Sequence, residues 1–362
     1  MGLRTAINRI TNIHTNSTVT VIAKQLNMEN LFTLVCTLAL LPVCLTADAP
    51  SVTLMNAAKP GTKMPVTGIG TGFYNHQPGS DRPGEVWNDT VAEKAIKEWI
   101  ALGGRRIDGC VDYGDQIGIG NAVKASGVPR KDIFMTSKIP LVGYNETLDL
   151  MKKVLNDLQM DYVDLLLIHG PALVGNSTDP VCKRDLPTWR ACRQSVWKAF
   201  EELFNSGKAL AIGVSNFEQN HLEDILMMKS MVPSVNQVEY QPYWHEDDLV
   251  AFCKSHNILF NGYSPLGAPD WGPVTRGWNG TLLELPLIQS IAKAHQRTPG
   301  QVIQQWQWQQ GIVVNPRSRN QDHMKENLNF FDFELTDDEM KQMSTIKPPD
   351  HPKVCGDPHN VK

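Results

Sequence analysis

Four polar residues follow apolar runs of the sequence, and together their types support proton transfer to a carbonyl oxygen. Asp108 and Tyr113 come after Arg-Arg-Ile, Lys138 after Ile-Phe-Met-Thr-Ser, and His169 after Leu-Leu-Leu-Ile. A tyrosine phenol, with a reference pKa of about 10, is a weak acid at neutral pH and needs a neighbouring cation that favours the phenolate. Lys138 is the candidate cation, Asp108 its counter-ion, and His169 can orient the carbonyl. Such a site delivers a proton and needs a separate source of hydride.

Each of these residues also has an ordinary structural explanation when taken alone. Tyr113 can be a strand-end tyrosine, Lys138 can solvate a loop, and His169 can be a core histidine with satisfied hydrogen bonds. Asp108 differs, because it lies in the apolar context Arg-Ile-Asp-Gly-Cys, where an unpaired carboxylate is costly. We therefore expect a buried partner for Asp108, and Lys138 is the best candidate.

The runs that carry these residues belong to an alternating series of strand-like and helix-like segments. Strand-like runs lie near 65–70, 105–108, 132–137, 163–168, 209–214, 234–238, 258–262 and 312–315, with helical patterns near 90–102, 115–125, 146–158, 190–206, 218–229, 245–256 and 283–310. Eight such units predict an α/β fold, the (β/α)8 TIM barrel, whose sites lie at the carboxyl ends of the strands.

Two further signals lie outside the eight units. Short apolar runs on either side of Lys59-Pro-Gly-Thr predict an N-terminal β-hairpin ahead of the first barrel strand. Near the other end of the chain, Thr336 followed by Glu339 forms the pattern of a capping box, which predicts the start of a last helix.

Size and charge limit the class of protein. The chain has 362 residues, 41% of them hydrophobic, and a formal net charge of −4. That length allows one barrel or two ordinary domains, and we favour a single barrel domain over residues 48–362. The acidic and basic residues are interspersed, so we expect no nucleic-acid partner and no attraction to an anionic membrane surface. We expect the protein to be a monomer that acts on a small molecule.

Residues 1–47 form a separate N-terminal extension. Residues 31–47 are uncharged and apolar apart from a break at Pro42, which is typical of the h-region of a signal peptide cleaved near Ala47. The run is short for a membrane anchor, although that reading stays open, and we expect no membrane association of the mature form. Secretion or residence in the endoplasmic reticulum lumen is the expectation. Residues 1–27 resemble a mitochondrial presequence, or form an upstream extension with Met28 as the working start. A cytoplasmic protein is the further alternative if the N-terminal segment is not used.

Glycosylation signals and cysteines bear on the same question. Four sequons follow the expected cleavage point, at Asn88, Asn145, Asn176 and Asn279, and they predict a glycoprotein. Among seven cysteines, Cys182 and Cys192 flank a polar stretch and can close that loop in an oxidising compartment. Neither the cysteine spacing nor the neighbouring histidines indicate a zinc site, so no metal is expected.

From about Val52 to about Lys347 the sequence resembles the aldo-keto reductase superfamily. The resemblance implies NADPH-dependent reduction of aldehydes and ketones, with Tyr113, Lys138, Asp108 and His169 as the catalytic tetrad. Its landmarks appear in order as Lys-Met-Pro-Val-Thr-Gly-Ile-Gly-Thr71, the Asp108–Tyr113 segment, Ser-Lys138, Leu-Ile-His169, Gly-Val-Ser215-Asn216-Phe, Val-Asn-Gln237, Gly-Tyr263-Ser264-Pro-Leu266-Gly, and Pro-Arg317-Ser318 followed by Glu326-Asn327.

The resemblance also implies where NADPH binds. A tyrosine can stack on the nicotinamide and amide side chains can bind its carboxamide, and an arginine with a serine suits the 2′-phosphate. The family commonly has lysine where Arg317 stands and arginine where His323 stands, so the strength of the NADPH preference stays open. The cofactor-binding residues implied are Thr71, Ser215, Asn216, Gln237, Tyr263, Ser264, Leu266, Arg317, Ser318, Glu326 and Asn327.

The substrate pocket departs from the common family pattern. Gly72 stands where many members have tryptophan, and Gly170 stands where an aromatic residue often follows the histidine. The pocket is therefore expected to be wide, with Phe73, Tyr74 and Trp271 as apolar walls, and to suit bulky carbonyls such as steroid-like ketones. The long connections 74–88 and 171–188 are expected to wall it. The rival hypothesis is a secreted barrel that binds the cofactor as a sensing module with little turnover.

Overall fold

The computed structural model describes residues 50–72, 87–173, 177–184, 187–270, 272–356 and 358–361. These residues belong to one compact unit. The apolar run at 31–47, and with it the predicted signal peptide, lies outside the described residues. Within those ranges, the structure contains no helix that is both long and apolar enough to span a membrane.

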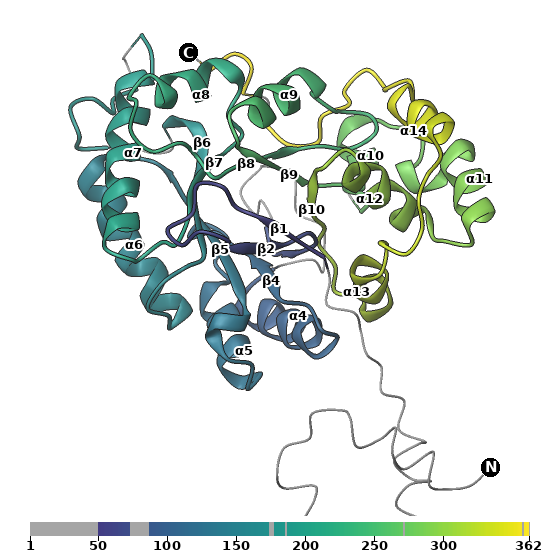
Figure 1. Cartoon of the computed structure of the whole chain (residues 1–362), viewed down its shortest axis with the longest axis horizontal. Coiled ribbons are helices and arrows are strands. Elements are labelled where there is room, and N and C mark those ends of the chain that lie inside the picture. Colours follow the sequence, from purple (N-terminus) through teal and green to yellow (C-terminus); the bar gives the residue numbers. More distant parts are fainter. Residues whose placement is uncertain are drawn as a thin grey trace, which may run out of the picture. The chain divides into compact units, whose positions relative to one another are not determined.

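Eight parallel strands form the centre of the molecule, each paired with the next in sequence order (Figure 1). A parallel bridge between Thr67 and Val314 joins the last strand to the segment before the first, which closes the sheet. The predicted TIM barrel is confirmed. The strands are β3 (Ile69–Gly70), β4 (Arg106–Asp108), β5 (Phe134–Leu141), β6 (Leu165–Leu173), β7 (Ile212–Ser215), β8 (Val235–Glu239), β9 (Leu259–Tyr263) and β10 (Val313–Asn315).

Helices surround this sheet and confirm the alternating pattern, although one expected helix is two helices and the helices at Gly272–Arg276 and Gln321–Leu328 were not expected. The helix expected over 283–310 is wrong, because Gln296 takes a left-handed conformation that ends one helix and Thr298 caps the next, which has Pro299 in its first turn. The helices are α4 (Asp89–Ala101), α5 (Gln116–Ala125), α6 (Tyr144–Leu158), α7 (Arg190–Asn205), α8 (Gln219–Leu226), α9 (Asp247–Ser255), α10 (Gly272–Arg276), α11 (Pro286–His295), α12 (Pro299–Gln309), α13 (Gln321–Leu328) and α14 (Asp337–Ser344), with 3-10 turns η1 (Arg130–Asp132) and η2 (Leu282–Glu284).

The predicted hairpin, β1 (Ser51–Thr53) and β2 (Lys63–Pro65), covers the amino-terminal end of the barrel. Ala58 N donates to Leu210 O (2.8 Å), just before β7. The hairpin supplies Leu54 and Met64 to a buried cluster that also contains residues of the barrel interior, among them Phe134, Leu165, Leu167, Val235 and Val313. One end of the barrel is therefore filled with apolar side chains, and only the carboxyl end is available for a site.

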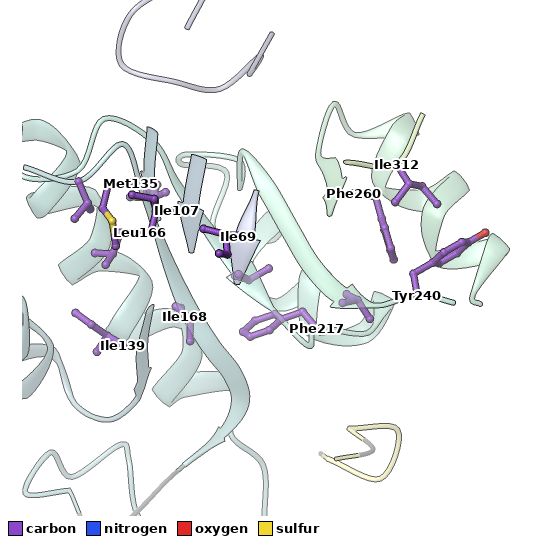
Figure 2. Packing of buried hydrophobic residues seen from close by; sticks show 14 of the residues in the cluster. Ile69, Ile107, Met135, Ile139, Leu166, Ile168, Phe217, Tyr240, Phe260 and Ile312 are labelled. Carbon is purple, nitrogen blue, oxygen red and sulfur yellow. The ribbon is translucent and has the colours of Figure 1, made fainter. Parts of the chain in front are cut away.

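Successive side chains of each strand alternate between the inner and the outer face of the barrel. Those that face inward at the carboxyl ends of the strands line the available site. On β6, Leu165 and Leu167 belong to the interior cluster, whereas Leu166 and Ile168 pack outward in the larger cluster shown in Figure 2. Because successive side chains of a strand face opposite sides, His169 points inward again. The same count, starting from the interior residues Phe134, Ala211, Val235 and Leu259, places Lys138, Ser215, Gln237 and Tyr263 on the inner face. Asp108 also faces inward, because its neighbour Ile107 packs in the outer cluster.

Candidate active site

Asp108 and Lys138 form an ion pair at the bottom of the site. Their side chains are each 2% exposed, and the Lys138 ammonium contacts Asp108 Oδ1 directly. Lys138 Nζ also donates to the Gly109 carbonyl (3.0 Å), and Gln237 Nε2 donates to Asp108 Oδ2 (2.6 Å). The carboxylate therefore has a partner on both oxygens. This is the arrangement that a buried ion pair needs if its desolvation is to be offset.

Tyr113 and His169 lie above this pair and remain partly exposed. The Tyr113 hydroxyl is 3.2 Å from His169 Nε2. Lys138 Nζ lies 5.2 Å from the centroid of the Tyr113 ring. The two groups that can touch a substrate thus face the opening, while the ion pair that acts on them electrostatically is shielded from water.

His169 is neutral at physiological pH. Burial, and then the nearby Lys138 ammonium, lower the pKa of His169 to about 3. Its other ring nitrogen, Nδ1, lies 3.3 Å from the Cys110 sulfur, which is also 3.4 Å from the Lys138 carbonyl. Burial raises the pKa of the Cys110 thiol, so the sulfur keeps its proton. A neutral imidazole carries one N–H, and its position depends on the hydrogen bond that the thiol makes.

The residues expected to contact nicotinamide lie next to the tetrad. Asn216 has a left-handed backbone (φ 59°) and joins three strands, because its Nδ2 donates to His169 O (2.9 Å) and its Oδ1 accepts from the Tyr263 hydroxyl (2.8 Å). Ser215 Oγ donates to Gln237 O (2.7 Å). The Tyr263 ring is partly exposed on the inner face. A flat ring beside two amides suits a planar aromatic carboxamide, so these residues fit the nicotinamide.

The other predicted cofactor residues on the first and penultimate barrel strands also lie at this end. Thr71 is buried directly after β3, and its hydroxyl donates to the Asp108 carbonyl (3.3 Å). Ser264 follows β9 in a left-handed conformation (φ 49°). Leu266 is partly buried against the outer apolar cluster. The structure therefore brings these three residues to the rim, although Thr71 offers no exposed surface.

The residues expected to bind the 2′-phosphate and the adenine of the cofactor lie after β10 and on α13. Arg317 Nη1 donates to the Gly72 carbonyl (3.0 Å), and its Nη2 lies 4.0 Å from Asp270. Ser318 is partly exposed beside it. Glu326 is partly exposed and accepts from the Thr298 hydroxyl (3.2 Å). The Asn327 side chain is buried and accepts from Gln304 (2.7 Å), which ties α13 to α12.

Two of the positions expected to shape the substrate pocket, Gly72 and Gly170, lie in the described part of the chain. Among the described residues, no atom lies within 4 Å of the position that a Cβ at Gly170 would take. A Cβ at Gly72 would lie 2.8 Å from the Tyr113 ring, so the tyrosine occupies the room that a side chain there would need. Phe73, Tyr74 and Trp271 lie outside the described residues. The wide pocket stays a prediction, and the absence of a side chain at Gly72 allows Tyr113 its position.

The described part of the connection 171–188 is fastened to helices at the rim. Ser177 Oγ donates to Glu146 (2.5 Å) on α6, and Asp179 accepts from Ser195 (3.1 Å) on α7. A disulfide joins Cys182 to Cys192, which lies in the first turn of α7. The pairing considered from the sequence is therefore present in the structure.

Two residues near the tetrad were missed from the sequence. One is Cys110, which contacts His169. The other is Asp115, a fully buried carboxylate at the N-cap of α5, whose pKa burial raises to about 7 against the opposing effects of the Thr71 hydroxyl and the Lys138 ammonium. The signal in the sequence was the segment Cys-Val-Asp-Tyr-Gly-Asp-Gln, which places several polar groups in a short connection directly after a strand.

Comparisons with known proteins agree on one family. A model of the aldo/keto reductase family matches residues 68–348. Aldo-keto reductase family 1 member A1 of Cricetulus griseus is 35% identical over 300 residues, covering 79% of this chain and 87% of that protein. The 9,11-endoperoxide prostaglandin H2 reductase of Trypanosoma cruzi is 34% identical over 311 residues, which cover 85% of this chain and 95% of that protein. An aldo-keto reductase of Bombyx mori solved in complex with NADP has a TM-score of 0.71 at 25% identity, and the match covers 85% of this chain and 100% of that one.

Proposed function

The chain belongs to the aldo/keto reductase family and reduces aldehydes or ketones to alcohols with NADPH, and we propose that Tyr113 is the proton donor of this reaction. The observation that carries the assignment is the short distance of 3.2 Å between the Tyr113 hydroxyl and His169 Nε2, both partly exposed above a buried ion pair. The proteins matched over most of their length are named as reductases, so a binding module without turnover is not favoured.

Each member of the tetrad has a separate task. Tyr113 donates its phenolic proton to the substrate oxygen, on which negative charge develops as the bond to hydrogen forms at carbon. Lys138 stabilises the phenolate that remains, and Asp108 keeps the lysine in place and offsets its charge. His169, being neutral, aligns the carbonyl oxygen through Nε2. The bound cofactor supplies the hydride. Stabilising charge on the oxygen is the largest part of the work.

Arg317 and Ser318 support a preference for NADPH over NADH. A guanidinium matches two phosphate oxygens at once, and a serine hydroxyl adds a third hydrogen bond. In this structure Arg317 is held at the rim by the Gly72 carbonyl and by Asp270. Replacement by alanine should therefore weaken NADPH more than NADH. His323 is exposed on α13, where the family commonly has an arginine.

The lack of a side chain at Gly170 supports bulky carbonyl substrates. None of the described residues comes within 4 Å of a Cβ at this position, so a tryptophan there would take up room next to His169. We therefore propose ketones of polycyclic size as the substrate class, with small aldehydes as weaker substrates. A large apolar substrate contributes binding energy through the area that it buries.

Three exposed sequons and the disulfide support a secreted or lumenal protein. Asn88, Asn145 and Asn279 are exposed, and the fourth sequon, at Asn176, lies outside the described residues. A disulfide persists in oxidising compartments. We propose that the mature chain is a monomeric glycoprotein there. A mobility shift after endoglycosidase treatment of the protein secreted by eukaryotic cells tests this, and an unshifted intracellular product would contradict it.

The function is tested by loss of NADPH absorbance with carbonyls ranging from small aldehydes to polycyclic ketones. We expect turnover of the bulky ketones, and expect Gly170→Trp to reduce it by about a hundredfold while small aldehydes lose less than about threefold. Arg317→Ala should raise the KM for NADPH about tenfold and leave that for NADH within about twofold. Small aldehydes outperforming every bulky ketone would contradict the substrate class, and no turnover of any carbonyl would contradict the function.

A further inference from the structure

Three potential metal ligands from distant parts of the sequence, none of them a member of the tetrad, meet on the carboxyl-terminal side of the barrel. Glu218 lies just before α8, Glu246 just before α9, and His359 in the segment after α14. His359 Nε2 is 3.6 Å from Glu218 Oε2 and 3.9 Å from Glu246 Oε2. The three ligand atoms all lie within 4.8 Å of one another. We propose that Glu218, Glu246 and His359 bind one divalent transition-metal ion, for which Zn²⁺ is the probe.

The distances agree with the geometry of such an ion. Zn²⁺ binds carboxylate oxygen and histidine nitrogen at about 2.0 to 2.2 Å, so two ligands of a tetrahedral site lie roughly 3.4 Å apart. The two measured separations, 3.6 and 3.9 Å, need only small side-chain rotations to reach that value. One imidazole with two carboxylates is a set of nitrogen and oxygen ligands that zinc accepts.

Neighbouring groups already orient the ligands. The Trp244 indole N–H donates to Glu246 Oε1 (2.8 Å), and Lys353 Nζ lies 3.5 Å from the same oxygen. Oε2 is thereby turned toward His359. The His359 ring is held edge-on against the Trp244 ring, with centroids 5.7 Å apart and an interplanar angle of 84°. Hydrogen bonds from a second layer of residues are what fix ligand orientation at protein metal sites.

Charge also favours a cation here. Two acidic side chains, Glu218 and Glu246, converge on His359 Nε2. Among the described residues, Lys353 is a cation that faces them, 3.5 Å from Glu246 Oε1. A divalent ion would offset both carboxylates at once, with the neutral imidazole of His359 as its third ligand.

The surroundings leave room for the remaining ligands. A surface hollow of about 380 Å³ borders the site and is lined by Glu218, Gln219, Asn220, Glu223 and His359. Glu218 and Glu246 are 13% exposed at their side chains and His359 is 44% exposed, so water and the ion can reach them from this side. A fourth ligand would be water.

A bound ion would fasten the carboxyl-terminal segment to the barrel. Figure 1 shows this yellow segment running from α14 past α9 to α8. Val354 N and Cys355 N donate to Glu239 at the end of β8 (2.8 Å each), and Val361 O lies 2.7 Å from His221 Nε2 on α8. His359 sits between these attachments. The metal would add a link that joins the segment to two loops at once.

The test is titration of the metal-free full chain with Zn²⁺, measured by calorimetry and by metal content after dialysis. We expect one equivalent to bind and to raise Tm, because a ligand that binds only the folded state stabilises it. His359→Gln and Glu218→Gln should each weaken binding by about tenfold or more and abolish the rise in Tm. The matched control, His256→Gln, replaces an exposed histidine on the far end of α9 and should bind as the original chain does.

Titration with Co²⁺ separates this site from the other described group of potential ligands, Cys110, Asp112 and His169, which belongs to the active site. A site of carboxylates and imidazole gives no thiolate-to-cobalt charge-transfer absorption, whereas binding through Cys110 does. No stoichiometric binding, binding that survives both substitutions, or a thiolate band that accounts for the bound cobalt would each overturn the proposal. Absence of binding would leave an ion pair of protonated His359 with the two carboxylates, and the reductase function would be unaffected.

Discussion

At the scale of residues, the contact between Cys110 and His169 bears on which nitrogen of the imidazole carries the proton. The thiol is close enough to donate to Nδ1 (3.3 Å) or to the Lys138 carbonyl (3.4 Å), but it has one proton. If Nδ1 accepts it, the imidazole proton lies on Nε2, which points at the Tyr113 hydroxyl and at the place of a substrate oxygen. That tautomer makes His169 a hydrogen-bond donor to the carbonyl, as the proposed reaction requires.

We therefore predict that Cys110→Ala lowers kcat/KM by roughly tenfold, the worth of about one hydrogen bond of 1.4 kcal/mol. Cys110→Ser should retain most activity, because a hydroxyl can donate to Nδ1 as the thiol does. The ring ¹⁵N chemical shifts of His169 report the tautomer directly. We expect the Nε2–H form in the original chain and in the serine variant. Unchanged shifts and unchanged kcat/KM in the alanine variant would show that the thiol is only packing.

At the scale of elements, strand-end positions were readable from the sequence because the barrel repeats one rule. Each apolar run predicted a strand, and the alternation of faces then brought Asp108, Lys138 and His169 to one end of the barrel. The break between α11 and α12 was not recognised, because the helical pattern continues across it and only Thr298-Pro299 marks the new start. Contacts between distant segments, such as His359 with Glu218, carry no local pattern at all.

The disulfide between Cys182 and Cys192, which are ten residues apart in the sequence, joins the connection after β6 to α7. In the chain-entropy model such a closure stabilises the folded state by roughly 2 to 3 kcal/mol. We predict that replacing both cysteines by serine lowers the free energy of unfolding by about that amount in urea titrations without reductant. Adding a thiol reductant should destabilise the original chain to the same extent and leave the double variant unchanged. An original chain that is indifferent to reductant would contradict the prediction.

For the whole molecule, the hairpin fills one end of the barrel and all titratable groups of the proposed mechanism gather at the other end. Asp115 is buried among them without a direct ion pair among the described contacts. Burial raises its pKa from 3.8 to about 7, so the folded state binds more protons than the unfolded state between these values. The contribution of Asp115 to the free energy of unfolding therefore falls as pH rises through this window. The full destabilisation from its buried charge is present above pH 7.

We predict that Asp115→Asn, which keeps the shape of the side chain and removes the charge, stabilises the protein above pH 7 and has no effect below about pH 4. The gain at pH 8 should be at most on the order of 4 kcal/mol. Thermal unfolding of both proteins across this pH range checks the prediction. Asp132→Asn, at an exposed carboxylate, is the matched control. A Tm difference that does not depend on pH would rule out the proposed titration of Asp115.

The proposed reaction depends on Tyr113 as the proton donor. The most direct test measures two properties of the Tyr113→Phe variant: its turnover of a ketone that the original chain reduces, and its affinity for NADPH. Phenylalanine keeps the ring beside Gly72 and removes only the hydroxyl. We predict that turnover falls by about 10²- to 10⁴-fold, while the Kd for NADPH, from fluorescence titration, stays within about twofold because the phenol is not among the proposed cofactor contacts. Equal losses of turnover and cofactor binding would show that Tyr113 is structural, and retained turnover would show that another group donates the proton.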